Sequence, residues 1–197
     1  MCNLFGSRMS WSELVEAFAD ADLPIVDPPA HAAPNLPERP EVRFTDPAPI
    51  VRSGGNGATL LEARWGLKGP RALVTNFRSE GRRFDRDSRC LIPLTEFYEF
   101  TGVKSPKTRW RFTTTDGRWP CFAGLWKADD EVGARFTLLT TAPGPDVAPI
   151  HDRQPVVLAR ERWAHWLGGG DEGDLLGPSP AGRLQAEWAG GPQPPML

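Results

Sequence analysis

The chain of 197 residues is long enough for one domain with an ample core, because 40% of its residues are hydrophobic. Its net charge of −2 excludes a global basic field, so nucleic-acid binding would need a local patch. The arginine-rich stretch 71–89 is the candidate patch, and a solvated loop is the alternative. Three cysteines without zinc spacing indicate a reduced cytoplasmic protein without a metal or other cofactor, and no apolar run is long enough to span a membrane.

The first predicted element is a short amphipathic helix. Ser10 and Glu13 fit a capping box at its start. One apolar face follows the cap, at Trp11, Leu14, Val15, Phe18 and Ala19. The proline-rich segment 24–49 then predicts an extended loop that wraps the core instead of a separate domain.

Short runs with β character, separated by turns, make up most of the remaining chain. They are residues 50–52, 59–65, 90–93, 97–100, 109–114, 121–126, 136–141 and 155–159. This pattern predicts an α+β fold with a mainly antiparallel, barrel-like β core and a few short flanking helices. Residues 160–167 and 183–188 predict helices, and 190–197 a disordered tail, so we expect one domain over residues 1–189.

Cys2 is the first residue whose chemistry points to a function. We expect removal of Met1, because a small residue follows it, and Cys2 would then carry a free amine beside its thiol. An aminothiol condenses with an aldehyde to an imine, and the thiol closes a thiazolidine ring. An α-amine titrates near ~8, so part of it is neutral at physiological pH. The alternative is an inert packed cysteine; a lipoprotein anchor is not expected, since only Met1 precedes Cys2.

Three other polar residues stand beside apolar strands. Asn76 follows an apolar run, where either a site residue or a turn asparagine is typical. Glu99 lies among aromatic residues, so enclosure would raise its pKa and suit it to proton transfer, whereas an exposed edge strand would leave it in water. His151 precedes an apolar strand and is a natural proton carrier, while His31 and His165 are expected to be structural.

Five motifs occur in order along the chain. They are MCNLF at 1–5, WGL at 65–67, NFRSE at 76–80, CLIP at 90–93 leading into FYEF at 97–100, and HDRQPV at 151–156. Together they resemble the SOS response-associated peptidase family, over residues 2 to about 158. The resemblance implies a mixed α/β fold on a barrel-like core. It also implies a protein that recognises abasic sites in single-stranded DNA and links itself to them covalently.

The resemblance implies a role for each candidate site residue. Cys2 is the nucleophile, and Asn76 positions it or the opened sugar. Glu99 is an acid/base group, and His151 handles protons at the sugar. We expect a monomer without membrane contact, located in the cytoplasm and on the nucleoid when bound to DNA.

Single-stranded DNA binders combine phosphate contacts with base stacking. Arg78 and Arg153 are the first candidates for phosphate contacts because they lie in the motifs, and Arg86 is a further one. Trp65 and Phe77 are candidate stacking platforms, and core packing is an equal alternative for Trp65. A steep fall of affinity with salt is expected if phosphates dominate binding.

The sequence departs from the family pattern at several positions. Asn3 and Leu4 replace the usual glycine and arginine, Gln154 stands where methionine is common, and a motif near residues 44–49 is shortened. Two other functions stay open. One is an N-terminal-nucleophile amidohydrolase or peptidase, in which the thiol attacks an amide. The other is a non-catalytic single-stranded DNA binding module, which Leu4 suggests.

Overall fold

The computed structural model describes residues 2–26, 36–55, 57–171 and 173–193, so His31 lies outside the described part. The α-helices are α1 (Trp11–Asp20) and α2 (Trp163–Gly168), and short 3₁₀ helices occupy Arg86–Ser88, Arg160–Arg162 and Gly173–Leu176. The strands are β1 (Leu4–Ser7), β2 (Arg39–Arg43), β3 (Pro47–Gly54), β4 (Gly57–Trp65), β5 (Leu67–Lys68), β6 (Leu73–Val74), β7 (Asn76–Arg78), β8 (Arg89–Pro93), β9 (Glu96–Thr101), β10 (Thr108–Thr114), β11 (Cys121–Asp129), β12 (Gly133–Thr141), β13 (Gln154–Pro155), β14 (Val157–Leu158) and β15 (Leu184–Gly190).

A closed barrel of five strands forms the core, in the order β12-β4-β3-β8-β11 with β11 pairing back to β12. Every pairing in this ring is antiparallel except that of β12 with β4. Apolar side chains such as Ile50, Ile92 and Phe136 fill its main buried cluster. The mainly antiparallel, barrel-like α+β fold expected from the sequence is therefore confirmed.

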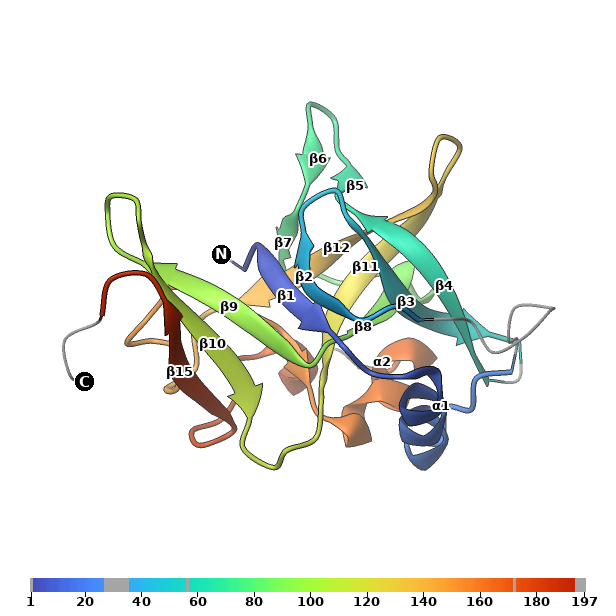
Figure 1. Cartoon of the computed structure of the whole chain (residues 1–197). Coiled ribbons are helices and arrows are strands. Elements are labelled where there is room, and N and C mark those ends of the chain that lie inside the picture. Colours follow the sequence, from blue (N-terminus) through green and yellow to red (C-terminus); the bar gives the residue numbers. More distant parts are fainter. Residues whose placement is uncertain (1, 27–35, 56, 172, 194–197) are drawn as a thin grey trace.

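A second antiparallel sheet, in the order β15-β10-β9-β1-β2, packs against the barrel (Figure 1). Phe97 of this sheet stacks on Phe112 at 4.9 Å and meets the barrel residue Phe122 edge-on at 5.6 Å. Phe5 of β1 also contacts Phe122, at 6.0 Å between ring centroids. These aromatic contacts hold the N-terminal strand against the barrel.

The two helices cover a separate buried cluster (Figure 1). The predicted capping box of α1 is confirmed, since Ser10 Oγ accepts from the backbone N of Glu13 while Glu13 accepts from the backbone N of Ser10. Phe18 of α1 packs on Trp163 of α2 at 4.7 Å. Trp166 donates a hydrogen bond of 2.9 Å to the carbonyl of Cys90, which joins α2 to β8. No helix among the described residues is long and apolar enough to cross a membrane.

The expected helix over residues 183–188 is wrong, because residues 184–190 form strand β15. Its residues carry no strong β preference, and pairing with β10 decides the conformation instead. Leu184 and Ala186 face the core cluster, while Glu187 forms a cross-strand ion pair of 2.6 Å with Arg111. The helix expected over 160–167 is present, with a 3₁₀ first turn.

The proline-rich segment is more ordered than expected. Its described part contains all of β2 and the beginning of β3, whereas residues 27–35 lie outside the described part. Pro40 is tolerated because β2 is the edge strand of its sheet. The expected tail also begins in the fold, since Gly190 ends β15 and Thr108 donates to the carbonyl of Pro192 at 2.8 Å. Residues 194–197 lie outside the described part.

Candidate active site

Four predicted site residues, distant in sequence, come together beside the barrel. Cys2 lies two residues before the start of β1, Asn76 begins β7, Glu99 lies in β9 and His151 precedes β13. The side-chain amide of Asn76 donates a hydrogen bond of 2.9 Å to the carbonyl oxygen of Cys2. Nε2 of His151 lies 3.6 Å from Oε2 of Glu99. We call these four residues the reactive cluster.

The position of Cys2 depends on how β1 pairs with β9. Phe5 faces Phe97 and Gly6 faces Glu96 in this antiparallel pair, which directs the preceding residues along β9 toward Glu99. Gly6 is required for close approach, since a Cβ there would lie 2.0 Å from Oε1 of Glu96. The buried Glu96 carboxylate also pairs with Arg8 at 2.6 Å. Gly6 and Glu96 therefore fix the register that places Cys2.

The thiol of Cys2 is fully buried and lies 3.5 Å from the carbonyl oxygen of Leu4, to which it donates. Burial raises the pKa of this thiol far above its ordinary value, and the negative charge of Glu99 raises it further. The group is therefore a neutral thiol at physiological pH. A proton acceptor nearby is needed before it can act as a nucleophile.

Glu99 is enclosed, with only 1% of its surface exposed. This agrees with the first of the two alternatives that the sequence left open. Desolvation raises the pKa of its carboxyl group to about 7. The exposed edge strand is excluded, because β9 pairs with β1 on one side and with β10 on the other. A carboxyl group with a pKa near neutrality can both donate and accept a proton at physiological pH.

His151 is held in a defined orientation by its own turn. The backbone N of Arg153 donates to Nδ1 of His151 at 3.0 Å. Nδ1 also lies 3.1 Å from the carbonyl oxygen of Arg153 and 3.0 Å from Oδ1 of Asp152, so its neighbours come from its own turn, and Nε2 is the nitrogen that faces Glu99. Desolvation lowers the pKa of the imidazole, although the adjacent Asp152 acts in the opposite direction. The neutral ring is thus favoured at physiological pH.

Asn76 is part of a strand and not of a turn. It pairs in parallel with Leu138 of β12, which places its side chain at the carbonyl of Cys2. Its Oδ1 is buried and has no hydrogen-bond partner among the described residues. Buried polar atoms are nearly always paired, so this oxygen can accept a hydrogen bond from a reacting group.

The predicted DNA contacts divide into different environments. Arg78 is exposed at the end of β7, and Phe77 beside it is half-buried with the guanidinium of Arg82 4.8 Å above its ring. The guanidinium of Arg153 is bound by both arms to the carboxylate of Glu80. Arg78 is thus the motif arginine whose side chain is exposed to solvent.

Trp65 and Arg86 have structural contacts. Trp65 is fully buried, donates to the carbonyl of Thr75 at 2.8 Å and packs on Phe5, so the core alternative is correct and a stacking platform is excluded. Arg86 bonds the carbonyl of Leu167 at 3.4 Å and Oγ of Ser53 at 3.3 Å. These two contacts join Arg86 to α2 and β3.

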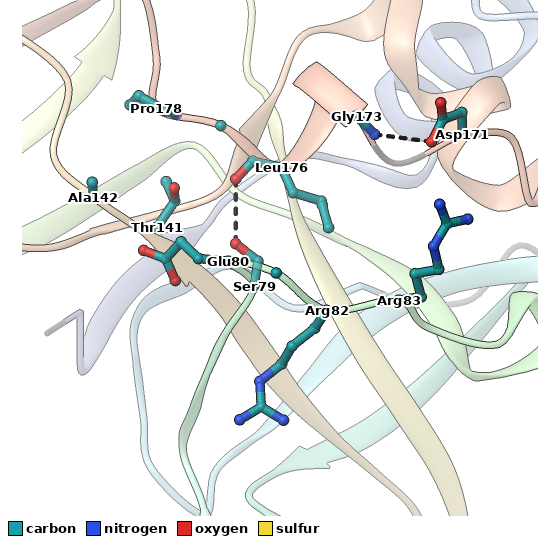
Figure 2. Close-up of a pocket in the computed structure, with 12 residues that line it drawn as sticks. Ser79, Glu80, Arg82, Arg83, Thr141, Ala142, Asp171, Gly173, Leu176 and Pro178 are labelled. Atoms are coloured by element: carbon teal, nitrogen blue, oxygen red, sulfur yellow. Dashed lines mark hydrogen bonds between the residues drawn. The ribbon is translucent and has the colours of Figure 1, made fainter.

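A cavity of about 580 Å³ lies beside Ser79 and Glu80, which follow the end of β7 (Figure 2). Its walls come from residues 79–83, 141–142 and part of 171–178. Arg82 and Arg83 supply positive charge there, and Ser79 donates to the carbonyl of Leu176 at 3.2 Å (Figure 2). The sequence offered the arginine-rich stretch as a patch but gave no signal for the wall formed by 171–178. No group of His, Cys, Asp and Glu within the described ranges could hold a metal ion.

Three of the residues that depart from the family pattern, Asn3, Leu4 and Gln154, lie in different environments. Leu4 is buried with 1% exposure, so it is a packing residue, whereas Asn3 is exposed. Gln154 is fully buried and bridges two segments: its Oε1 accepts from the backbone N of Gly144 at 2.6 Å, and its Nε2 donates to Ser179 at 3.1 Å. An unbranched apolar side chain could fill this space but would leave both partners unsatisfied.

Comparisons with known proteins place the chain in a family. Abasic site processing protein YoaM of Bacillus subtilis is 28% identical over 186 residues, covering 85% of this chain and 79% of the relative. Abasic site processing protein YobE of the same organism is 27% identical over 187 residues, covering 85% of this chain and 82% of the relative. A crystal structure of a Bordetella bronchiseptica protein, 22% identical, covers 96% of this chain and 100% of that chain with a TM-score of 0.74, which shows a shared fold. The model of the family described as SOS response associated peptidase (SRAP) matches residues 1–186, and the chain belongs to this family.

Proposed function

We propose that this protein binds single-stranded DNA at abasic sites and, after removal of Met1, links Cys2 to the lesion as a thiazolidine. The observation that carries the proposal is the reactive cluster, in which Asn76 holds the backbone of Cys2 and His151 faces Glu99. Relatives that carry the name abasic site processing protein support the choice of lesion. A ring-opened abasic site is an aldehyde, the group that an aminothiol captures.

The chemistry proceeds in two stages. The free amine of Cys2 attacks the aldehyde carbon to give a carbinolamine, which loses water to form an imine. The thiol sulfur then bonds to the imine carbon, and its proton passes to the nitrogen. The sum is one aldehyde plus one aminothiol giving one thiazolidine and one water, with no oxidant or reductant.

Glu99 is suited to both stages because its pKa is raised to about 7. Its protonated form donates to the hydroxyl group that leaves as water. The resulting carboxylate can accept the thiol proton, which the high pKa of Cys2 makes necessary. His151, with Nε2 facing Glu99, relays protons between this carboxyl group and the sugar.

Ring closure determines the outcome for the DNA strand. An imine at an abasic site promotes β-elimination, which would break the strand. Addition of the thiol consumes the imine and leaves the strand intact. We therefore infer that the product is a shielded lesion and not a cleaved one.

Binding to the strand combines charge with stacking. Arg78 is exposed beside the reactive cluster residue Asn76, and Arg82 and Arg83 line the neighbouring cavity. Phe77 is the remaining stacking candidate, through the part of its side chain that is not buried. These residues give the local positive patch that a chain with a net charge of −2 requires for DNA binding.

A denaturing gel tests the proposal. Purified protein lacking Met1, confirmed by mass, is incubated with single-stranded DNA carrying one abasic site, beside an intact strand. We expect a shifted band that requires both the lesion and Cys2, and its loss in Cys2→Ala. Absence of the band from wild-type protein would refute covalent capture. Turnover of glutamine by the same preparation would instead support the amidohydrolase, and unchanged binding by Cys2→Ala without any covalent species would support the non-catalytic module.

A further inference from the structure

An ion pair between Glu80 and Arg153 lies over barrel strand β12, next to the reactive cluster. Both terminal guanidinium nitrogens of Arg153 donate to the carboxylate of Glu80, and Nη2 lies 3.0 Å from Oε2. Nη2 also donates to Oγ1 of Thr140 at 3.2 Å. A two-armed contact of this kind fixes orientation as well as charge.

The strand register explains why these residues meet. In β12, Thr140 pairs with Arg78 of β7 and also with Pro155 of β13. Glu80 comes two residues after Arg78, and Arg153 two residues before Pro155. The two side chains therefore meet over Thr140, at the point where β7 ends and β13 begins.

Glu80 has a rigid base. The preceding residue, Ser79, is buried, and its backbone N donates to the carbonyl of Thr140 at 2.9 Å. Its hydroxyl group lies 3.0 Å from the same carbonyl and 3.2 Å from that of Leu176 (Figure 2). Glu80 thus projects from a backbone that cannot easily shift.

Arg153 is in turn tied to the imidazole of His151. Its backbone N lies 3.0 Å from Nδ1 and its carbonyl oxygen 3.1 Å from the same atom, while Nε2 faces Glu99. The guanidinium and the backbone N–H belong to the same residue, so fixing one restrains the other. In the ion pair, the side chain of Arg153 is 13% exposed and that of Glu80 is 44% exposed.

We propose that Glu80 is a positioning residue, which acts through Arg153 to hold the His151 turn so that Nε2 faces Glu99. The inference rests on the proposed function for its catalytic meaning. In this structure the guanidinium of Arg153 is bonded to Glu80, and its contact with a DNA phosphate stays a prediction. Arg153 lowers the pKa of Glu80 through their hydrogen bonds, so the pair persists at neutral pH. A phosphate that took the place of Glu80 would have to break both of these bonds.

The first test separates binding from reaction. Glu80→Gln keeps the shape of the side chain and removes its charge. We expect the crosslinking rate at saturating abasic DNA to fall about tenfold or more, since misplacing a reacting group by ~1 Å can cost about a hundredfold. The Kd for an intact strand should stay unchanged or become tighter, because a negative charge is lost. A weaker Kd with an unchanged saturating rate would show that Arg153 serves a phosphate and would overturn the proposal.

A charge exchange provides the second test. The double variant Glu80→Arg with Arg153→Glu restores an ion pair but places the arginine on the other segment. Rescue of the saturating rate relative to Arg153→Glu alone is expected, and failure of rescue in a folded double variant overturns the proposal. Glu187→Gln is the matched control, because it removes one partner of the exposed ion pair with Arg111 on β10. Its rate should equal that of the wild type.

A spectroscopic test does not depend on crosslinking. The ¹⁵N shifts of His151 should show a neutral ring with one tautomer in the wild type and a mixture of tautomers in Glu80→Gln. Identical shifts in both proteins would overturn the proposal. If the wild type formed no crosslink at all, the proposed function would fail, while this comparison would still decide whether Glu80 orients His151.

Discussion

The side-chain amide of Asn76 donates a hydrogen bond of 2.9 Å to the carbonyl oxygen of Cys2, across 74 residues of sequence. This bond holds the backbone of the residue whose amine and thiol are proposed to react. It also leaves Oδ1 of Asn76 buried and available as an acceptor. Asn76 is therefore placed to fix the nucleophile and to contact a reacting group.

Removing this amide should slow capture more than it weakens the fold. We expect Asn76→Ala to lower the crosslinking rate by about tenfold to a hundredfold, because the reacting amine loses its fixed position. The free energy of unfolding should fall by only about 1 kcal/mol, the usual contribution of one hydrogen bond. Single-turnover kinetics and urea unfolding check the two values. An unchanged rate would remove Asn76 from the mechanism.

Glu99→Gln should cause a larger loss of rate. Positioned proton transfer typically contributes a factor of about 10² to 10⁴, and glutamine cannot exchange protons in this range. The wild-type rate should vary with the ionisation of a group whose pKa is about 7, and this dependence should be absent from Glu99→Gln. Rates measured across a pH series check this prediction. A retained dependence with the same midpoint would assign the titration to another group.

The same substitution should change how stability depends on pH. The pKa of Glu99 is about 7 in the folded protein, against about 4.3 for an unfolded glutamate, so the folded state binds the proton more tightly. Stability from this group is present below the unfolded pKa and is lost as the pH rises through the folded pKa. As the pH rises between these limits, the free energy of unfolding of the wild type should fall relative to that of Glu99→Gln by on the order of 4 kcal/mol. Denaturation of both proteins at a series of pH values would reveal a flat difference if Glu99 were solvated.

Gly6→Ala tests the register that places Cys2. The new Cβ would lie 2.0 Å from Oε1 of Glu96, so β1 or the buried carboxylate must shift. We expect a loss of about 1 to 3 kcal/mol in the free energy of unfolding, typical of overpacking, together with slower crosslinking. Gly55→Ala is the control, since its Cβ would meet nothing within 4 Å. Equal stability of the two variants would contradict the proposed constraint.

Arg78→Gln should reduce affinity for DNA in a salt-dependent way. Loss of one phosphate contact to a single strand should lower the slope of log K against log salt by about 0.7. Fluorescence anisotropy with an intact strand over a range of salt concentrations measures this slope. The same slope in both proteins would exclude Arg78 as a phosphate ligand.

Much of the fold could be predicted because the strands alternate in polarity or carry compact apolar runs. The barrel strands β4, β8, β11 and β12 follow such patterns, and Ser10 and Glu13 form the capping box that begins α1. Strand β15 could not be predicted in this way, because its Ala, Gln and Glu residues suit a helix and only pairing with β10 makes it a strand. Tertiary pairing outweighs local preference at such a position.

The site residues were predictable by type, but their contacts were not. The aromatic surroundings of Glu99 indicated an enclosed carboxyl group, which its burial confirms. The pair of Glu80 with Arg153 depends on two strands meeting Thr140 at the same register, which no local pattern encodes. Trp65 had two equal readings because a tryptophan suits both a core and a stacking surface, and only its full burial decides between them.

Mass spectrometry of the crosslink tests the central claim most directly. Protein lacking Met1 is reacted with a short abasic strand, treated with borohydride, digested with protease and nuclease, and analysed for the modified peptide. The account predicts an adduct on the peptide that begins at Cys2, equal to the sum of the parts minus one water, without the two hydrogens that borohydride adds to an imine. An adduct on a lysine, a reduced imine at Cys2, or no adduct at all would contradict it.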